Sequence, residues 1–131
     1  MKPFSCTKCQ IARWLARFLA GVFFLLWGSF FLHHLNEWYF NPVDRPPLWV
    51  TGLMALHFGL LVGLAMGWKW ELAGGLLVLS CGIAFFGLMG AWKIWFLIGP
   101  TLLPGVLWLV VGFNPPRTDP QAQNKPLTES N

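Results

Sequence analysis

The fold is decided by residues 52–82, which read GLMALHFGLLVGLAMGWKWELAGGLLVLSCG. Two apolar runs meet in this stretch at the tetrapeptide Trp68-Lys69-Trp70-Glu71. Each run holds close to the ~20 residues that a helix needs to cross ~30 Å of hydrocarbon. So short a connection between two such runs predicts a tight transmembrane helical hairpin. We expect the rest of the chain to form a second hairpin around it.

The composition of the whole chain indicates a lipid environment. Of the 131 residues, 56% are hydrophobic and 11% are charged, whereas a soluble domain has roughly 25% charged residues. Hydrocarbon offers backbone N–H and C=O groups no water partner, so only helices or closed barrels span it. The apolar runs are continuous and not alternating, which excludes barrel strands. We therefore predict an all-α membrane protein, a four-transmembrane-helix bundle made of two helical hairpins.

Three regions are expected along the chain: an N-terminal segment (1–10), a transmembrane domain (11–113) and a C-terminal tail (114–131). The four helices are predicted to span about residues 11–35, 48–68, 72–92 and 94–113. The tail is rich in Pro, Gln, Asn, Ser and Thr and has almost nothing to bury, so it is expected to be disordered. The first apolar run lacks a small-x-small cleavage site, so we expect it to stay in the mature protein and not to act as a signal peptide.

Basic residues are unequally shared between the two predicted ends of the bundle. With both termini on one side, that side collects Lys2, Lys8, Arg13, Arg17, Lys69, Arg117 and Lys125, and the other side only Arg45 and Lys93. An excess of basic residues marks the cytoplasmic side. We therefore predict an inner (plasma) membrane protein with cytoplasmic N and C termini. We assign the net charge of +4 to contact with the lipid bilayer, and we expect no nucleic-acid partner.

The predicted second helix carries Gly59, Gly63 and Gly67 at a spacing of four. Small residues on one face allow a neighbouring backbone to approach closely, which is how helices associate in lipid. We interpret this face as helix packing inside the bundle. The alternative is that a glycine face binds another membrane subunit or a second copy of the chain.

The turn Trp68-Lys69-Trp70-Glu71 is interpreted as an interfacial anchor. The two indoles suit the headgroup level, Lys69 can extend toward the headgroups, and Glu71 complements the positive end of the third helix. The alternative is an exposed corner that docks a partner or binds lipid.

Three histidines carry the chemical hypotheses. His33 and His34 lie four and three residues before Glu37, so either can share a helix face with this carboxylate. Such a set suits a divalent metal or a proton relay, and a solvated helix end is the alternative. His57 falls near mid-membrane, where an ionisable residue needs a partner and raises a functional hypothesis. It is either a neutral histidine bonded to a neighbouring carbonyl, or a metal, haem or proton site shared with His33 or His34.

Two further features are weaker signals. Cys6 and Cys9 form at most half of a zinc site, because tetrahedral zinc takes four ligands, so another chain would have to complete it. Pro100 and Pro104 remove backbone donors from the fourth helix. We interpret them as a kink, with an ion path as the alternative.

Several of these residues resemble one family. They are Ala55-Leu56-His57, the run Gly67-Trp68-Lys69-Trp70-Glu71-Leu72-Ala73-Gly74-Gly75, the pair Gly99-Pro100 and the run Pro104-Gly105-Val106-Leu107. The chain is similar over about residues 13–113 to a family of small uncharacterised four-helix prokaryotic membrane proteins with a W-K-W-E turn between the middle helices. The resemblance implies the architecture and supplies no activity. The Cys6–Cys9 pair and the His33–His34 doublet depart from the family pattern.

The leading functional hypothesis is a multi-pass inner-membrane protein that acts as a non-catalytic accessory or scaffold subunit. We expect no catalytic residues and no enzymatic activity. The second hypothesis is a metal, haem or proton site built on His57 with His33, His34 and Glu37. The third is a small oligomeric transporter with a water-lined seam that contains His57 and the Pro100 kink.

Overall fold

The computed structural model describes residues 6–40 and 46–113, and side chains within residues 10–40, 46–91 and 93–113. These residues form four long helices: α1 (Cys6–Leu35), α2 (Leu48–Met66), α3 (Glu71–Met89) and α4 (Trp95–Phe113). A π-helical segment, η1 (Asn36–Phe40), follows α1, and a 3-10 segment, η2 (Ala91–Ile94), precedes α4. The α2, α3 and α4 helices and the span Gln10–Phe40 are each long and apolar enough to cross a membrane. The predicted disordered tail lies outside the described residues.

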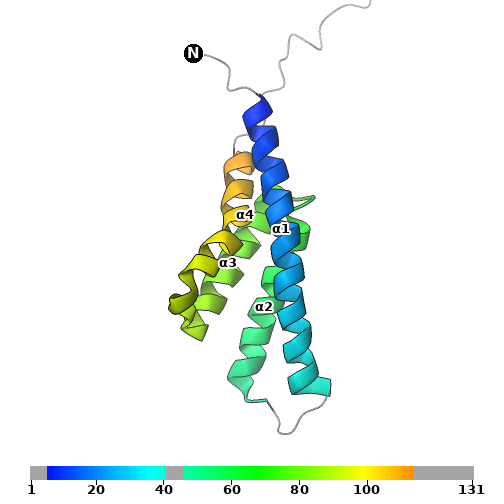
Figure 1. The fold of residues 1–131 in the computed structure, drawn as a ribbon, viewed down its shortest axis with the longest axis vertical. Helices are drawn as coiled ribbons and strands as arrows, with labels where there is room; N and C mark the ends of the chain where they lie inside the picture. The colour runs from blue at the N-terminus through cyan, green and yellow to red at the C-terminus, as the bar shows by residue number, and fades with distance from the viewer. Residues whose placement is uncertain (1–5, 41–45, 114–131) are drawn as a thin grey trace, which may run out of the picture.

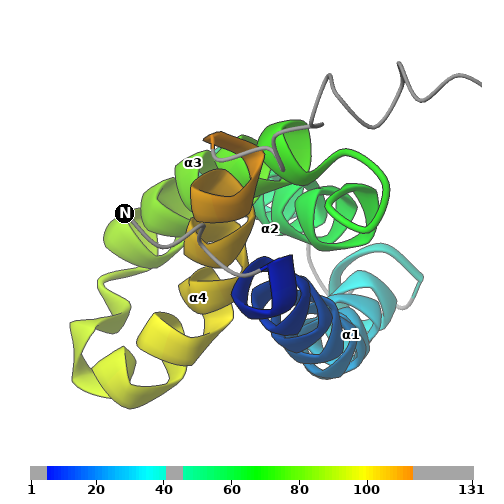
Figure 2. The same ribbon diagram turned by 90° about the horizontal axis from the view of Figure 1, so that it is seen from above.

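The helices form two antiparallel hairpins that close into a ring. α1 packs against α2 and α4, and α3 packs against the same two helices, as the view from above shows (Figure 2). The start of α1, the α2–α3 turn and the end of α4 lie at one end of the bundle (Figure 1). We call this the turn end, and the opposite end, where α1 and α2 are joined, the loop end.

Two helix boundaries correct the sequence prediction. α1 begins at Cys6 and not near Ile11, so the first helix starts within the segment predicted for residues 1–10. Hydropathy marks where a helix can enter lipid, whereas residues 6–10 include no helix breaker and continue the same helix. α3 ends at Met89 and not at residue 92 because Gly90 adopts the left-handed conformation, with φ 66°. Such a glycine is a frequent helix stop.

The core lies where aromatic rings from all four helices meet. The most deeply buried large side chains include Leu60 and Leu64 of α2, Phe86 of α3 and Trp108 of α4, and α1 contributes Phe23 and Trp27. His57 and Thr101 are the buried polar residues among the described side chains. Their surroundings are therefore the first place to look for a functional site.

Gly59 and Gly63 in α2, and Gly67 directly after it, allow α3 and α4 to approach. A Cβ atom on Gly59 would lie 2.7 Å from Cys81 Sγ, and one on Gly63 would lie 2.8 Å from Val78 N. A Cβ atom on Gly67 would overlap the indole of Trp108. All three glycines thus face helices of the same chain, which is the arrangement expected for packing inside the bundle.

Candidate functional site

A cluster of charged side chains joins α1 to the start of α3 at the turn end. Arg13 Nε lies 2.8 Å from Glu71 Oε1, and Arg17 Nη2 lies 3.9 Å from the same oxygen. Arg17 Nη2 also donates a hydrogen bond of 3.2 Å to the Trp68 carbonyl. We call Arg13, Arg17 and Glu71 the arginine cluster.

The arginine cluster has a simple origin in the local structure. Arg13 and Arg17 are four residues apart and therefore share one face of α1. Glu71 is the first residue of α3, where a negative charge also complements the helix dipole. Its side chain is only 15% exposed, against 37% and 34% for the two arginines. The carboxylate is thus shielded, and the pair is more than a solvated surface contact.

Sequence reasoning placed these three residues at the same end of the bundle but did not pair them. It assigned the arginines to the cytoplasmic side of the membrane and Glu71 to the positive end of the third helix. The signal that could have paired them was the scarcity of carboxylates. Between Glu37 and the tail the acidic residues are Asp44 and Glu71, so Glu71 was the one carboxylate expected at the same end as the two arginines.

The rest of the tetrapeptide is exposed. Trp68 and Trp70 are 53% and 58% exposed, and Lys69 Nζ lies 5.5 Å from the centroid of the Trp70 ring. These side chains stand where an interfacial anchor is expected.

His57 lies in the middle of α2, nine residues from each end, and is 2% exposed. Three aromatic rings surround its imidazole, with centroids at 5.8 Å for Trp27, 5.4 Å for Phe31 and 4.9 Å for Phe85. We call these three rings the aromatic cage. It draws on α1 and α3, so His57 is enclosed by its own chain.

One polar atom of His57 is satisfied and the other is not. The backbone of Trp27 hydrogen-bonds the imidazole, whereas the buried Nε2 atom has no partner among the described residues. A neutral imidazole has one donor and one acceptor nitrogen. The arrangement therefore suits a neutral ring that donates a hydrogen bond to the Trp27 backbone. The acceptor nitrogen, Nε2, is then unpaired and faces apolar side chains.

The histidines at the end of α1 do not join this site. His34 Nδ1 lies 3.7 Å from Glu37 Oε2, with side chains 41% and 59% exposed, and the His33 ring lies 5.9 Å from the His34 ring. Glu37 therefore pairs with His34 and not with His33. The rings around His57 belong to Trp27, Phe31 and Phe85, and neither His33 nor His34 is among them.

No group of three or more His, Cys, Asp or Glu side chains that could hold a metal ion occurs within the described parts of the chain. The side chains of Cys6 and Cys9 lie outside these parts. Cys81 is a free, half-buried thiol.

A hydrogen-bonded pair joins α1 to α4 beside the aromatic cage. Trp27 Nε1 donates to Thr101 Oγ1 at 3.0 Å, and this hydroxyl donates to the Leu97 carbonyl at 2.7 Å. Thr101 lies between the two helical prolines, Pro100 and Pro104. Sequence reasoning missed this pair because nothing local in the sequence links residues 74 positions apart.

We expect the Trp27–Thr101 hydrogen bond to be measurable by a double-mutant cycle. Thr101→Val keeps the side-chain shape but leaves the Trp27 N–H unpaired, and the expected loss is about 1–2 kcal/mol of unfolding free energy. In a protein in which Trp27→Phe has already removed the donor, Thr101→Val should lower the unfolding free energy by less. A coupling energy of about 0.6 kcal/mol or more is expected for an interhelical bond in lipid. Unfolding by sodium dodecyl sulfate in mixed micelles measures it, and additive losses would show that the bond does not form.

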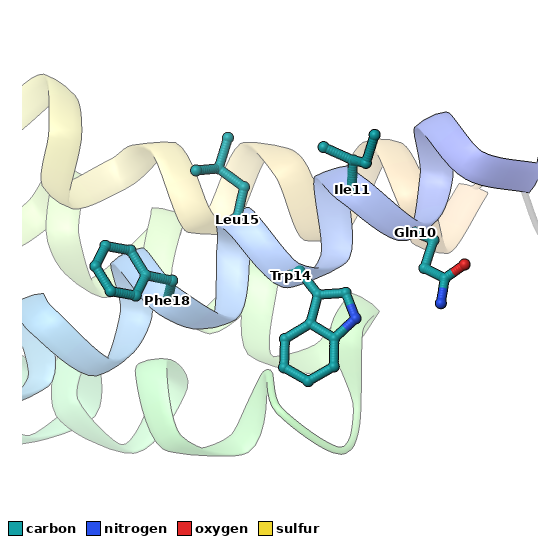
Figure 3. A pocket seen from close by; sticks show the side chains of 5 residues that line it. All are labelled: Gln10, Ile11, Trp14, Leu15 and Phe18. Carbon is teal, nitrogen blue, oxygen red and sulfur yellow. The ribbon is translucent and has the colours of Figure 1, made fainter.

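Two shallow hollows lie on the surface near the turn end. One, of about 540 Å³, is lined by Gln10, Ile11, Trp14, Leu15 and Phe18. All five lie on α1, with Gln10 and Trp14 projecting to one side and Ile11 and Leu15 to the other (Figure 3). The second, of about 510 Å³, is lined by Trp70, Glu71, Leu72, Ala73, Leu76 and Gly112. Both are open and mainly apolar, and His57 lines neither.

Comparison with known proteins identifies one family. A family model described as a domain of unknown function (DUF7670) matches residues 5–123, which include all four long helices. No curated protein and no solved structure matches the chain. The finding agrees with the resemblance to an uncharacterised family.

Proposed function

We propose that this chain, which belongs to the family of the domain of unknown function DUF7670, is a non-catalytic accessory or scaffold subunit of the inner membrane. All four helices cross the bilayer, and both termini face the cytoplasm. Four long apolar helices and the excess of basic residues expected on the side of the termini support this topology. We also propose that the family is prokaryotic and shares the W-K-W-E turn.

The observation that carries the proposal is the extent of α1. It has 30 residues, against 19 in each of the other long helices, which corresponds to ~45 Å against ~28 Å. Because Arg13 contacts the first residue of α3, residues 6–12 extend past the start of that helix. Figure 1 shows this first part of α1 projecting beyond the turn end.

The projecting part of α1 carries an apolar side chain where hydrocarbon does not cover it. The arginine cluster belongs at the headgroup level, since charged groups are costly in the hydrocarbon. Ile11 lies on the far side of this level and is 61% exposed. A partner subunit would bury this side chain, which lipid tails do not reach. The span that includes α1 is also the least buried of the four.

The proposal is tested by purification in a gentle detergent from the native membrane. The wild-type chain should retain a second polypeptide, and Ile11→Ser should release it. Ile83→Ser is the matched control, because Ile83 is 58% exposed but lies within α3, where lipid covers it. Equal retention of the polypeptide by both variants would contradict the assignment to α1.

The second candidate function is a ligand or proton site at His57, favoured by the buried Nε2 atom without a described partner. A metal ion or a haem iron would take this nitrogen as a ligand. Elemental analysis and an absorption spectrum of the purified protein test it. The second candidate predicts a bound metal or haem signal that His57→Ala abolishes, and metal-free, colourless protein would exclude such a ligand.

The transporter hypothesis requires a water-lined seam with His57 and Pro100. Pro100 is exposed on the surface of α4, whereas His57 is enclosed in the aromatic cage, so the seam would have to open between packed helices. Solute flux into liposomes that contain only this chain would support the transporter and contradict the accessory role.

A further inference from the structure

We propose that the turn end binds the phosphodiester headgroup of an anionic phospholipid through Arg13 and Arg17 of α1 and Lys69 of the α2–α3 turn. The site goes beyond the accessory role and rests on the membrane insertion proposed above. Three features carry it: an excess of positive charge, donors that remain accessible, and an apolar hollow next to the charges.

The positive charge of the arginine cluster is only partly neutralised. Arg13 and Arg17 approach the same oxygen of one carboxylate, Glu71 Oε1. Two guanidinium groups against one carboxylate leave a charge of +1, and Lys69 in the adjacent turn is exposed and adds a second positive charge. An anion at this end therefore meets a net attraction that Glu71 does not cancel.

The two arginines keep donors available for such an anion. A guanidinium has five N–H donors in a fixed fork. The Nε atoms of both arginines are buried, and the described contacts run through Arg13 Nε and Arg17 Nη2, so the donors left for an anion are on Arg13 Nη1 and Nη2 and on Arg17 Nη1. Both side chains are about one third exposed. The fork matches the oxygens of a phosphate group in a bidentate arrangement. Glu71 acts as a positioning residue, because its carboxylate holds the two forks side by side.

The surroundings fit a lipid headgroup better than a soluble anion. The exposed indoles of Trp68 and Trp70 stand beside the charges, and indoles prefer the headgroup level, where their N–H groups can donate. Glu71 also borders the hollow of about 510 Å³ whose other lining residues include Trp70, Leu72, Ala73 and Leu76. An acyl chain can occupy this apolar hollow, whereas inorganic phosphate gains nothing from it. Anionic lipids are also enriched in the cytoplasmic leaflet, where we place this end.

The test compares lipids on the purified full-length chain in dodecyl maltoside. Native mass spectrometry should show phosphatidylglycerol retained in preference to phosphatidylcholine. Replacing both arginines, in R13Q/R17Q, should weaken this preference on the order of tenfold, as expected for the loss of two charges near an anionic headgroup. Lys93→Gln is the matched control, because Lys93 is an exposed cation in η2, and its preference should equal that of the wild type.

Three outcomes would overturn the proposal: equal retention of the two lipids by the wild type, an unchanged preference in R13Q/R17Q, or complete displacement of phosphatidylglycerol by inorganic phosphate. The last result would identify a soluble-anion site. If R13Q/R17Q does not fold, the wild-type comparison and the phosphate competition still decide. A chain that inserts into liposomes but shows no lipid preference would refute this site and leave the membrane topology intact.

Discussion

Gly74→Ala is expected to lower the unfolding free energy by about 3 kcal/mol, at the upper end of the usual effect of overpacking. A Cβ atom on Gly74 would overlap the backbone N and Cα of Gly67 and lie 3.0 Å from the Gly63 carbonyl oxygen. Backbone atoms cannot rotate away as a side chain does. α2 and α3 would therefore have to move apart near the turn that joins them. Thermal unfolding in dodecyl maltoside, followed by near-ultraviolet circular dichroism, measures the loss.

Gly87→Ala is the matched control in the same helix. A Cβ atom on Gly87 would meet no described atom within 4 Å, and alanine favours a helix over glycine by up to about 1 kcal/mol. The two substitutions should thus have opposite signs. If Gly74→Ala unfolds at the same temperature as Gly87→Ala, α2 and α3 do not approach as closely as the structure shows.

Trp27→Ala is expected to lower the unfolding free energy by about 3–5 kcal/mol, as for other buried aromatic truncations. Trp27 is 7% exposed, and its ring contacts His57, Phe85 and Phe86 with centroids 5.2–6.5 Å apart. The substitution leaves a cavity between α1, α2 and α3 and also removes the hydrogen bond to Thr101. Unfolding by sodium dodecyl sulfate in mixed micelles measures the effect.

The control for Trp27→Ala is Trp95→Ala. Trp95 is a tryptophan at the start of α4 and is 73% exposed, so its truncation leaves no internal cavity. We expect a change within about 0.5 kcal/mol, as for other surface substitutions. Similar losses for the two variants would place Trp27 outside the core and remove the basis for an enclosed His57.

Hydropathy predicted the four helices because each apolar run has the length and composition of a helix that can cross a membrane. The short connection around Trp68-Lys69-Trp70-Glu71 likewise predicted the α2–α3 hairpin. The end of α3 could not be read in this way, since the residues after Gly90 are also apolar. α3 ends because Gly90 adopts the left-handed conformation. The presence of this glycine was the feature of the sequence that could have predicted the end of the helix.

The candidate site was only partly predictable, because its contacts join residues far apart in the sequence. The position of His57 in the middle of α2 predicted that its imidazole needs a hydrogen-bond partner. The rings that enclose it come from α1 and α3, and no periodicity in either helix specifies how they face His57. The pairing of Arg13 with Glu71 depends in the same way on how α1 passes the α2–α3 turn.

The mass of the complex released from native membranes by a gentle detergent tests the accessory role most directly. The chain itself has a mass of 14.8 kDa. We predict by native mass spectrometry a larger particle that contains this chain and a different polypeptide in a fixed ratio. A particle of 14.8 kDa, or integer multiples of that mass alone, would contradict the account.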